Sequence, residues 1–312
     1  MVLNQVKTHR IVKVYSILFK GGIVIVLLFG LNSCNSKNNI TSDLLKGKDF
    51  LYKENLDSAQ FYYYKILDSD SNNNIAINKL AEIHFRKVEI GKALNFFNKS
   101  ISIDSTNEDA YFKVAEIKLF LGDYKSVFIN INKGLRINDR RPEAYFMKGV
   151  AYKHIGDTTK SISSFKTAIE LEHDFAKVYY ELGLLLTLQN DSQAIDYYKR
   201  GIEISPEDSG LKYSLAWSYD HFEKYKESDK MYAIVLKQFP YFTQAKSNYA
   251  VFKYKLNQID TALLLCNEVL KDDSLNYSTL NLKGTILKEK GMLNESQKIK
   301  DKLLLIDSAL EF

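Results

Sequence analysis

Residues that build catalytic centres, metal sites and disulfides are scarce in this chain. Its 312 residues include two cysteines, five histidines and three prolines. The sequence contains no glycine-rich phosphate loop, no Gly-x-Ser-x-Gly motif, and no Cys and His arranged as a nucleophile with its base. Four histidines lack the paired spacing of metal ligands: His84, His154, His173 and His221. These absences predict a protein that is not an enzyme and holds no metal or cofactor.

Strand patterns are nearly absent, and acidic residues are missing from the N-terminal segment. No Asp or Glu precedes Cys34, whereas four basic residues do: Lys7, Arg10, Lys13 and Lys20. The first 33 residues carry +4 of the formal net charge of +5, which leaves +1 for the rest of the chain. A nearly neutral remainder offers no electrostatic footprint for a phosphate backbone, so nucleic acid is not an expected partner.

The chain is organised instead by a period of 34 residues. A small residue recurs in register at Gly47, Ala81, Ala115, Gly149, Gly183, Ala216, Ala250 and Gly284. A second small column consists of Ala59, Ala93, Val127, Ser161, Ala194, Ser228, Ala262 and Ser296. Larger side chains form a third column at Tyr63, Phe97, Ile131, Phe165, Tyr198, Tyr232 and Cys266. Such columns predict a repeat array in which helices approach closely at the small residues and larger side chains fill the gaps.

One unit, residues 142–175, shows the local structure that the pattern predicts. Its apolar and small residues follow helical spacing in two short segments. Between them, Gly156 tolerates a positive φ and Asp157 is able to cap the next helix. A lone pair of short helices cannot bury its apolar face, so the unit requires copies of itself on either side.

The period, the order of small and aromatic residues and the turn at Gly122–Tyr124 resemble the tetratricopeptide repeat family. The resemblance implies an all-α fold, a right-handed α-solenoid of eight helix-turn-helix units over residues 40–310. The expected units are 40–73, 74–107, 108–141, 142–175, 176–208, 209–242, 243–276 and 277–310. A polar C-terminal cap helix is expected at residues 294–305, where Lys300 occupies the column of large side chains.

The N-terminal segment resembles a bacterial lipoprotein signal peptide. An apolar run at residues 21–31 follows the basic residues and is too short to span a bilayer, which needs about 20 residues. It ends in Leu-Asn-Ser-Cys, similar to a lipobox, so we expect residues 1–33 to be removed and Cys34 to be lipidated, for example by palmitate. Residues 34–39 would then form a polar tether. The alternative is a short buried helix with a chance cysteine.

The resemblance places the protein in the bacterial cell envelope. Asn35 after the lipidated cysteine favours the outer membrane, by analogy with enterobacterial sorting, with the array facing the periplasm or the cell surface. The mature chain would retain Cys266 as its single thiol, which we interpret as a small buried hydrophobic residue. No intramolecular disulfide is then expected.

Candidate binding residues lie in the first helix of each unit, which the family resemblance places along a concave groove. One column there reads Leu44, Asn78, Phe112, Phe146, Tyr180, Tyr213, Ser247 and Asn281, and Trp217 and Tyr254 lie one turn further on. Six of these form the predicted partner-binding stripe: Phe112, Phe146, Tyr180, Tyr213, Trp217 and Tyr254. Aromatic side chains near polar groups favour an extended peptide. The same pattern fits packing against the neighbouring unit, and the rings are equally suited to stacking on sugars.

The predicted function is a non-catalytic protein–protein interaction scaffold, anchored to the envelope by a lipidated cysteine and holding an envelope protein or peptide in its groove. The alternative is a glycan- or peptide-capturing lipoprotein that serves nutrient uptake. A third class, an enzyme with an unfamiliar site, has no motif in its favour.

Overall fold

The computed structural model describes residues 32–310, with side chains over residues 39–306. All regular secondary structure in this range is α-helical. The chain divides within α5 into two compact units, the first ending at Ile117 and the second beginning at Lys118. Residues 1–31, which carry most of the predicted signal peptide, lie outside the described range.

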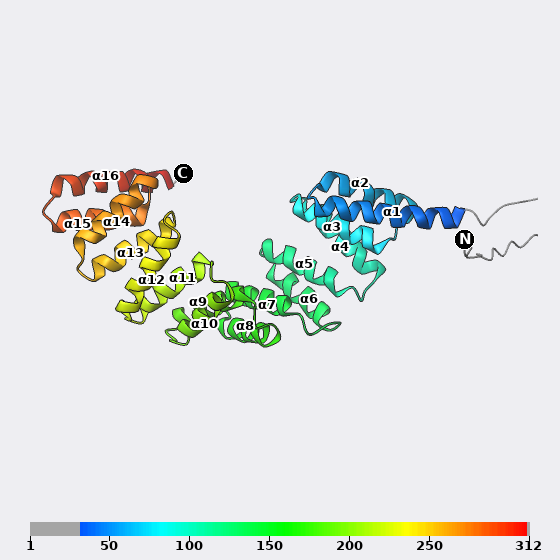
Figure 1. Cartoon of the computed structure of the whole chain (residues 1–312), viewed down its shortest axis with the longest axis horizontal. Helices are drawn as coiled ribbons and strands as arrows, with labels where there is room; N and C mark the ends of the chain where they lie inside the picture. The colour runs from blue at the N-terminus through cyan, green and yellow to red at the C-terminus, as the bar shows by residue number, and fades with distance from the viewer. Residues whose placement is uncertain (1–31, 311–312) are drawn as a thin grey trace, which may run out of the picture. The chain divides into compact units, whose positions relative to one another are not determined.

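The first unit is built from helical hairpins (Figure 1). Its helices are α1 (Asn32–Tyr52), α2 (Leu56–Ser69), α3 (Asn74–Arg86), α4 (Ile90–Ile103) and the greater part of α5 (Glu108–Phe120). Helix α1 packs against α2, and α3 against α4, while α2 also packs on α3. The apolar core between α2 and α3 is formed by Ala59, Tyr63, Ile66, Ala76, Leu80 and Ile83.

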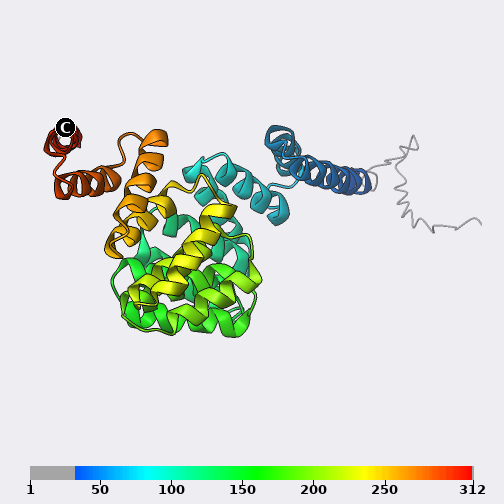
Figure 2. The ribbon, with the colours of Figure 1, turned by 60° about the vertical axis from the view of Figure 1, so that its left-hand side comes forward.

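The second unit repeats the same hairpin, as Figures 1 and 2 show from two directions. It contains α6 (Tyr124–Leu135), α7 (Pro142–His154), α8 (Thr158–Leu171), α9 (Ala176–Leu188), α10 (Ala194–Ile204), α11 (Ser209–His221), α12 (Tyr225–Gln238), α13 (Thr243–Lys255), α14 (Ile259–Asp272), α15 (Tyr277–Glu289) and α16 (Leu293–Leu310). From α7 onward each odd-numbered helix packs against the next even-numbered one, and α8, α10, α12 and α14 each pack against the first helix of the following hairpin. The helical-repeat fold predicted from the period is confirmed.

The turn inside each hairpin has the same backbone structure. One residue per turn has a positive φ, between 55° and 80°: Glu54, Val88, Gly122, Gly156, Asn190, Glu223, Asn257 and Gly291. The next residue donates its N–H to a carbonyl five residues earlier, as Asp157 does to Tyr152 at 3.0 Å. This pair of features is the Schellman ending of a helix. The predicted roles of Gly156 and Asp157 are confirmed, because the Asp157 carboxylate also accepts the N–H of Lys160 at 3.1 Å.

The columns of the repeat form the core of the hairpins. All seven members of the large column, from Tyr63 to Cys266, are at most 2% exposed. Where the second small column holds serine, its hydroxyl donates to the carbonyl of the small residue in the first helix: Ser161 to Gly149, Ser228 to Ala216 and Ser296 to Gly284, at 2.8–2.9 Å. A small polar side chain is therefore tolerated in the core because it has a fixed acceptor.

Both ends of the described chain differ from the expectation in detail. Helix α1 begins at Asn32, so the stretch predicted as a tether lies in its first turns, with Cys34 as the third residue. No proline or glycine occurs between Asn32 and Lys46 to interrupt that helix. At the other end, α16 exposes Lys298 and Lys300 as expected of a polar cap, but it also exposes Leu304. None of the described helices is long and apolar enough to cross a bilayer.

Candidate functional site

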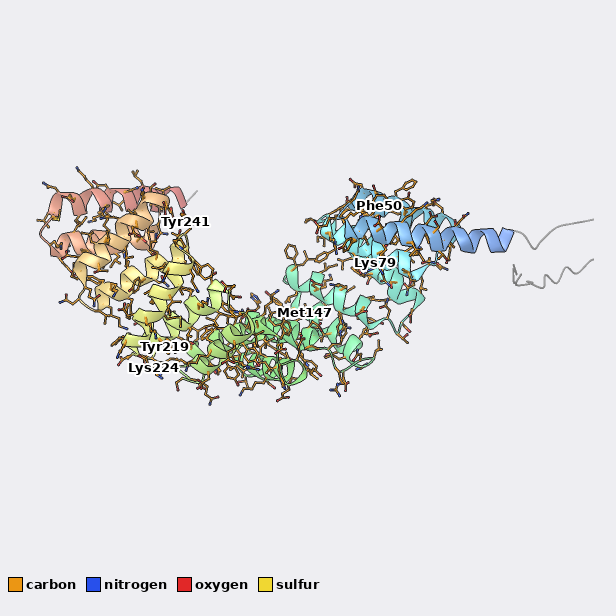
Figure 3. The ribbon with its side chains drawn as sticks, viewed as in Figure 1. Phe50, Lys79, Met147, Tyr219, Lys224 and Tyr241 are labelled. Carbon is orange, nitrogen blue, oxygen red and sulfur yellow. The ribbon has the colours of Figure 1, made fainter. Side chains whose placement is uncertain are left out.

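The first two repeats contain an open recess between their first helices, α1 and α3. Its volume is about 410 Å³. Helix α1 contributes Leu44, Leu45, Lys48, Leu51 and Tyr52; α3 contributes Ile75, Lys79, Glu82 and Arg86; and Tyr63 of α2 lies at its base. Figure 3 marks Lys79 on α3 at this place. The recess lies wholly within the first compact unit.

Helical spacing directs these side chains into the recess. On α1, Leu45, Lys48 and Tyr52 are three and four residues apart and share one face. The adjoining side chains Leu44 and Leu51 pack against the core that α2 and α3 form. The start of α3 is fixed by Asn73, whose side chain accepts the N–H of Ala76 at 3.1 Å. The two helices are therefore held by the core while their outer faces line the recess.

The walls of the recess combine exposed apolar and charged groups. Leu45 is 66% exposed, Tyr52 86% and Ile75 58%. Lys79 forms an ion pair with Glu82 at 2.9 Å. Burial, with a smaller contribution from Glu82, raises the pKa of Tyr63 to about 12, so its phenol stays neutral at physiological pH. The recess therefore combines exposed apolar surface with a small number of charged groups.

The residues of the predicted aromatic stripe have packing partners within the compact unit to which each belongs. Phe112 of α5 is only 6% exposed and belongs to the first unit. The other five belong to the second unit and are half-buried. The Phe146 ring lies 5.2 Å from that of Phe175, and the Tyr213 ring lies 5.3 Å from that of Phe242. These two rings of the predicted stripe thus pack against the aromatic residue that ends their own repeat, just before the next helix.

The remaining three aromatics also have partners in the second compact unit, of three different kinds. Tyr180 packs against the core formed by α8 to α11. The Trp217 ring lies 5.8 Å from that of His221 in the same helix. The Tyr254 hydroxyl donates to the Glu289 carboxylate of α15 at 2.6 Å, and this hydrogen bond raises the pKa of Tyr254. Binding by these residues stays a prediction.

Four charged residues on first helices of the repeats are all ion-paired. Lys153 of α7 pairs with Glu181 of α9 at 2.6 Å, and Asp220 of α11 with Lys255 of α13 at 2.8 Å. In the first unit, Glu82 and Glu116 pair with lysines of their own helices, Lys79 and Lys113. In the second unit, polar and aromatic groups therefore connect successive first helices to each other.

Sequence reasoning missed the recess because it followed a single column. Leu45, Tyr52 and Ile75 occupy other positions of the repeat. A signal was available at the second position of each unit. There Ile75 stands alone among the residues Thr41, Asp109, Glu143, Lys177, Gly210, Gln244 and Ser278. This departure of Ile75 from its column is the sequence feature that coincides with the recess.

The histidines of the described range have structural partners, as two of them show. The His84 side chain is fully buried, stacks on Phe96 with ring centroids 5.4 Å apart, and is hydrogen-bonded to Tyr64 and to Glu89. His154 stacks on Tyr124. Among the described residues, no group of three or more His, Cys, Asp or Glu side chains is placed to hold a metal ion.

Comparisons with known proteins agree with this architecture. Residues 142–174 and 176–208 match the family model described as Tetratricopeptide repeat. Curated protein sequences give no match.

Among solved structures, PilF of Pseudomonas aeruginosa is 15% identical with a TM-score of 0.61, covering 69% of this chain and 99% of its own. A tetratricopeptide repeat protein from Parabacteroides merdae is 16% identical with a TM-score of 0.58, covering 80% and 99%. PilW, described as a widely conserved type IV pilus biogenesis factor, is 16% identical with a TM-score of 0.57, covering 63% and 91%. At these identities the likeness concerns the fold alone. The chain thus contains tetratricopeptide repeats within an all-α helical-repeat fold.

Proposed function

We propose that this chain is a non-catalytic scaffold that binds a partner protein or peptide along the first helices of its repeats, and that a lipidated Cys34 holds it at the bacterial envelope. The observation that carries the binding part is the recess between α1 and α3. Three large apolar side chains that line it, Leu45, Tyr52 and Ile75, are more than half exposed. Apolar side chains gathered in a concave surface favour binding of a partner that covers them.

The half-buried aromatic row of the second unit is proposed as a further contact surface. Phe146, Tyr180, Tyr213, Trp217 and Tyr254 each keep part of their surface in solvent. A partner that crosses successive first helices would touch the remaining exposed edges of these rings. Because the same rings also pack against neighbouring side chains of the second compact unit, their removal is expected to lower stability as well as binding. Stability must therefore be measured beside binding for every variant.

Affinity capture from envelope extract tests the scaffold proposal. The bait is the full-length chain, beside a recess variant with Leu45→Ser, Tyr52→Ser and Ile75→Ser. A second variant carries Tyr180→Ala, Tyr213→Ala and Trp217→Ala. We expect a defined partner to be held by the parent chain and lost from the recess variant, while helicity is unchanged. Equal capture by parent and recess variant contradicts a role for the recess.

Membrane fractionation tests the anchor. The Cys34→Ser variant should leave the membrane fraction, because it carries no acyl chains. Each CH₂ group of such a chain that enters the bilayer contributes about 0.8 kcal/mol to membrane binding. The matched control is Cys266→Ala, which removes the other thiol of the chain and should remain in the membrane. Separation of inner and outer membranes then tests the proposed outer-membrane location. Unchanged membrane attachment of Cys34→Ser would contradict lipid anchoring at this residue.

A further inference from the structure

We propose that the recess between α1 and α3 binds an acidic amphipathic segment of a partner protein, in which Leu, Ile or Phe side chains are flanked by Asp or Glu. This inference rests on the proposed scaffold function and specifies the chemistry of its ligand. It is carried by two features of one surface: exposed apolar side chains, and two cations without a counterion among the described residues.

The apolar feature calls for aliphatic or aromatic side chains on the ligand. Leu44 and Leu51 are half-buried, while Leu45, Tyr52 and Ile75 remain largely in solvent. A ligand side chain placed against them removes apolar surface from water on both partners, which favours association. Tyr52 adds a ring that is 86% exposed and able to cover a neighbouring side chain.

The charges of the recess call for carboxylates. Three cations and one carboxylate line it, and the ion pair of Lys79 with Glu82 leaves the charges of Lys48 and Arg86 uncompensated. Both of these side chains belong to exposed residues, and neither forms an ion pair or hydrogen bond with any described residue. A neutral apolar ligand would cover these cations without pairing them, and a basic ligand would repel them.

Lys48 and Arg86 are exceptional within the first unit. Every other lysine described there has a partner. Lys53, Lys65, Lys79, Lys87, Lys92 and Lys113 form ion pairs with Asp or Glu, Lys46 lies over the ring of Tyr62, and Lys99 donates to the carbonyl of Ser71. The two unpartnered cations of this described part of the chain therefore line the same recess.

The spacing along the helices sets the length of the ligand. Arg86 follows Ile75 by eleven residues on α3, which corresponds to about 16 Å along the helix axis. An extended peptide covers that span with about five residues. On α1, Lys48 lies between Leu45 and Tyr52 on one face. A short segment that alternates hydrophobic and acidic residues therefore matches both the apolar walls and the separated cations.

Fluorescence polarisation with defined peptide pools tests this inference on the purified full-length chain. The probe is a labelled pool of blocked eight-residue peptides that alternate Glu or Asp with Leu, Ile or Phe. Matched pools replace the acidic residues by Gln and Asn, or by Lys and Arg. We expect the acidic pool to bind, the neutral pool to bind about tenfold more weakly or less, and added salt to weaken the acidic pool.

Paired variants locate the binding. Lys48→Gln with Arg86→Gln should weaken binding of the acidic pool about tenfold. The control, Lys53→Gln with Lys92→Gln, removes the same charge from the same unit outside the recess and should leave binding unchanged. Tyr52→Ser with Ile75→Ser should also weaken binding of the acidic pool. A purely electrostatic attraction would not be affected by the loss of these two apolar side chains. Circular dichroism and the urea midpoint check the fold of each variant.

Several outcomes would overturn the inference. Equal binding of the neutral and acidic pools removes the role of the cations, and equal effects of the two charge variants remove the role of the recess. Sedimentation that shows self-association through Lys48 and Arg86 makes a second copy of the chain the occupant. If no pool binds while envelope capture still depends on the recess, the acidic ligand is wrong and the scaffold proposal stands. If no pool binds and envelope capture does not depend on the recess either, both the acidic ligand and the binding role of the recess are contradicted.

Discussion

Gly149 of α7 lies directly against the ring of Phe165 in α8: a Cβ added at Gly149 would be 2.5 Å from the Phe165 ring carbon Cε1. That separation is far below van der Waals contact, and Phe165 is fully buried in an interior where side chains are closely packed. The small and large columns of the repeat are therefore two sides of one contact. The close approach of the paired helices depends on the missing side chain.

Gly149→Ala should destabilise the protein by about 1–3 kcal/mol, because an added methyl overpacks this contact. Gly91→Ala is the matched control: Gly91 lies in the first turn of α4, and its added Cβ would meet nothing within 4 Å. That control should be neutral or stabilising by up to about 1 kcal/mol. Urea unfolding followed by circular dichroism measures both. Equal midpoints for the two variants would contradict the packing of Gly149 on Phe165.

Val88→Gly should stabilise the protein. Val88 ends the turn after α3 with φ of 61°, a left-handed conformation that costs a β-branched residue about 1–2 kcal/mol, and its side chain is 72% exposed. Glycine adopts this conformation without strain, as Gly122 and Gly156 do in equivalent turns. Val88→Ala keeps a Cβ and should recover only part of the gain. A lower midpoint for Val88→Gly than for Val88→Ala would show that the side chain, not the backbone, decides stability there.

The hairpins were predicted well from the sequence because the same set of contacts recurs in successive repeats. Tyr198 and Phe165 occupy one column, and both are fully buried. Contacts inside a hairpin join fixed positions of the same unit, such as Ser161 and Gly149, which are twelve residues apart. A column read across units therefore predicts the core and the turn chemistry.

The surface was harder to predict because its contacts join different positions of neighbouring units. The Tyr213 hydroxyl is held by Asn248, and the Tyr254 hydroxyl by Glu289, each 35 residues further along the chain. No comparison of equivalent positions reveals that such a pair exists. The exposed position of Ile75 was not predicted for the opposite reason. This residue differs from the others in its column, and its side chain remains largely exposed.

Removal of the Asp229 carboxylate should leave the buried ammonium group of Lys253 without a counterion. Lys253 is only 7% exposed, pairs with Asp229 at 2.5 Å and lies 5.0 Å from the ring centre of Tyr249, whose hydroxyl donates to the same carboxylate. Asp229→Asn should cost about 1–3 kcal/mol, because the Lys253 ammonium then lacks a counterion and water reaches it poorly.

The double variant Asp229→Asn with Lys253→Met separates charge from packing. It replaces the ammonium by an apolar chain of similar length, so most of the lost stability should return. Thermal unfolding of the single and double variants measures the difference. If the double variant is as unstable as Asp229→Asn alone, the carboxylate acts through Tyr249 instead of through Lys253.

Acidification should weaken the cap of α8. The hydrogen bond from the Lys160 side chain, with that from its backbone N–H, lowers the pKa of Asp157. A carboxyl whose pKa is lower in the folded state stabilises the protein above its unfolded pKa of about 4, and this contribution is lost as pH falls through the folded value. Asp157→Asn keeps a capping side chain but does not titrate. Its urea midpoint should therefore fall less than that of the parent between about pH 5 and about pH 2.5. Asp139→Asn, whose carboxylate has no partner among the described residues, should show the parental pH dependence.

The Cys266 thiol should resist modification until its hairpin opens. Cys266 is fully buried between α13 and α15 in the column of large side chains, and burial raises its pKa to about 11. At pH 8 only about one thiol in a thousand would be the reactive thiolate even if reagent reached it. In a Cys34→Ser background, we expect a disulfide reagent to react with the native chain at least about a thousandfold more slowly than with the urea-unfolded chain.

Ser163→Cys, placed on the exposed face of α8 in a background that also carries Cys266→Ala, provides a thiol that should react at once. Rapid modification of native Cys266 would mean that α14 separates readily from its neighbours, because the reagent reaches this position only when the column of large side chains opens.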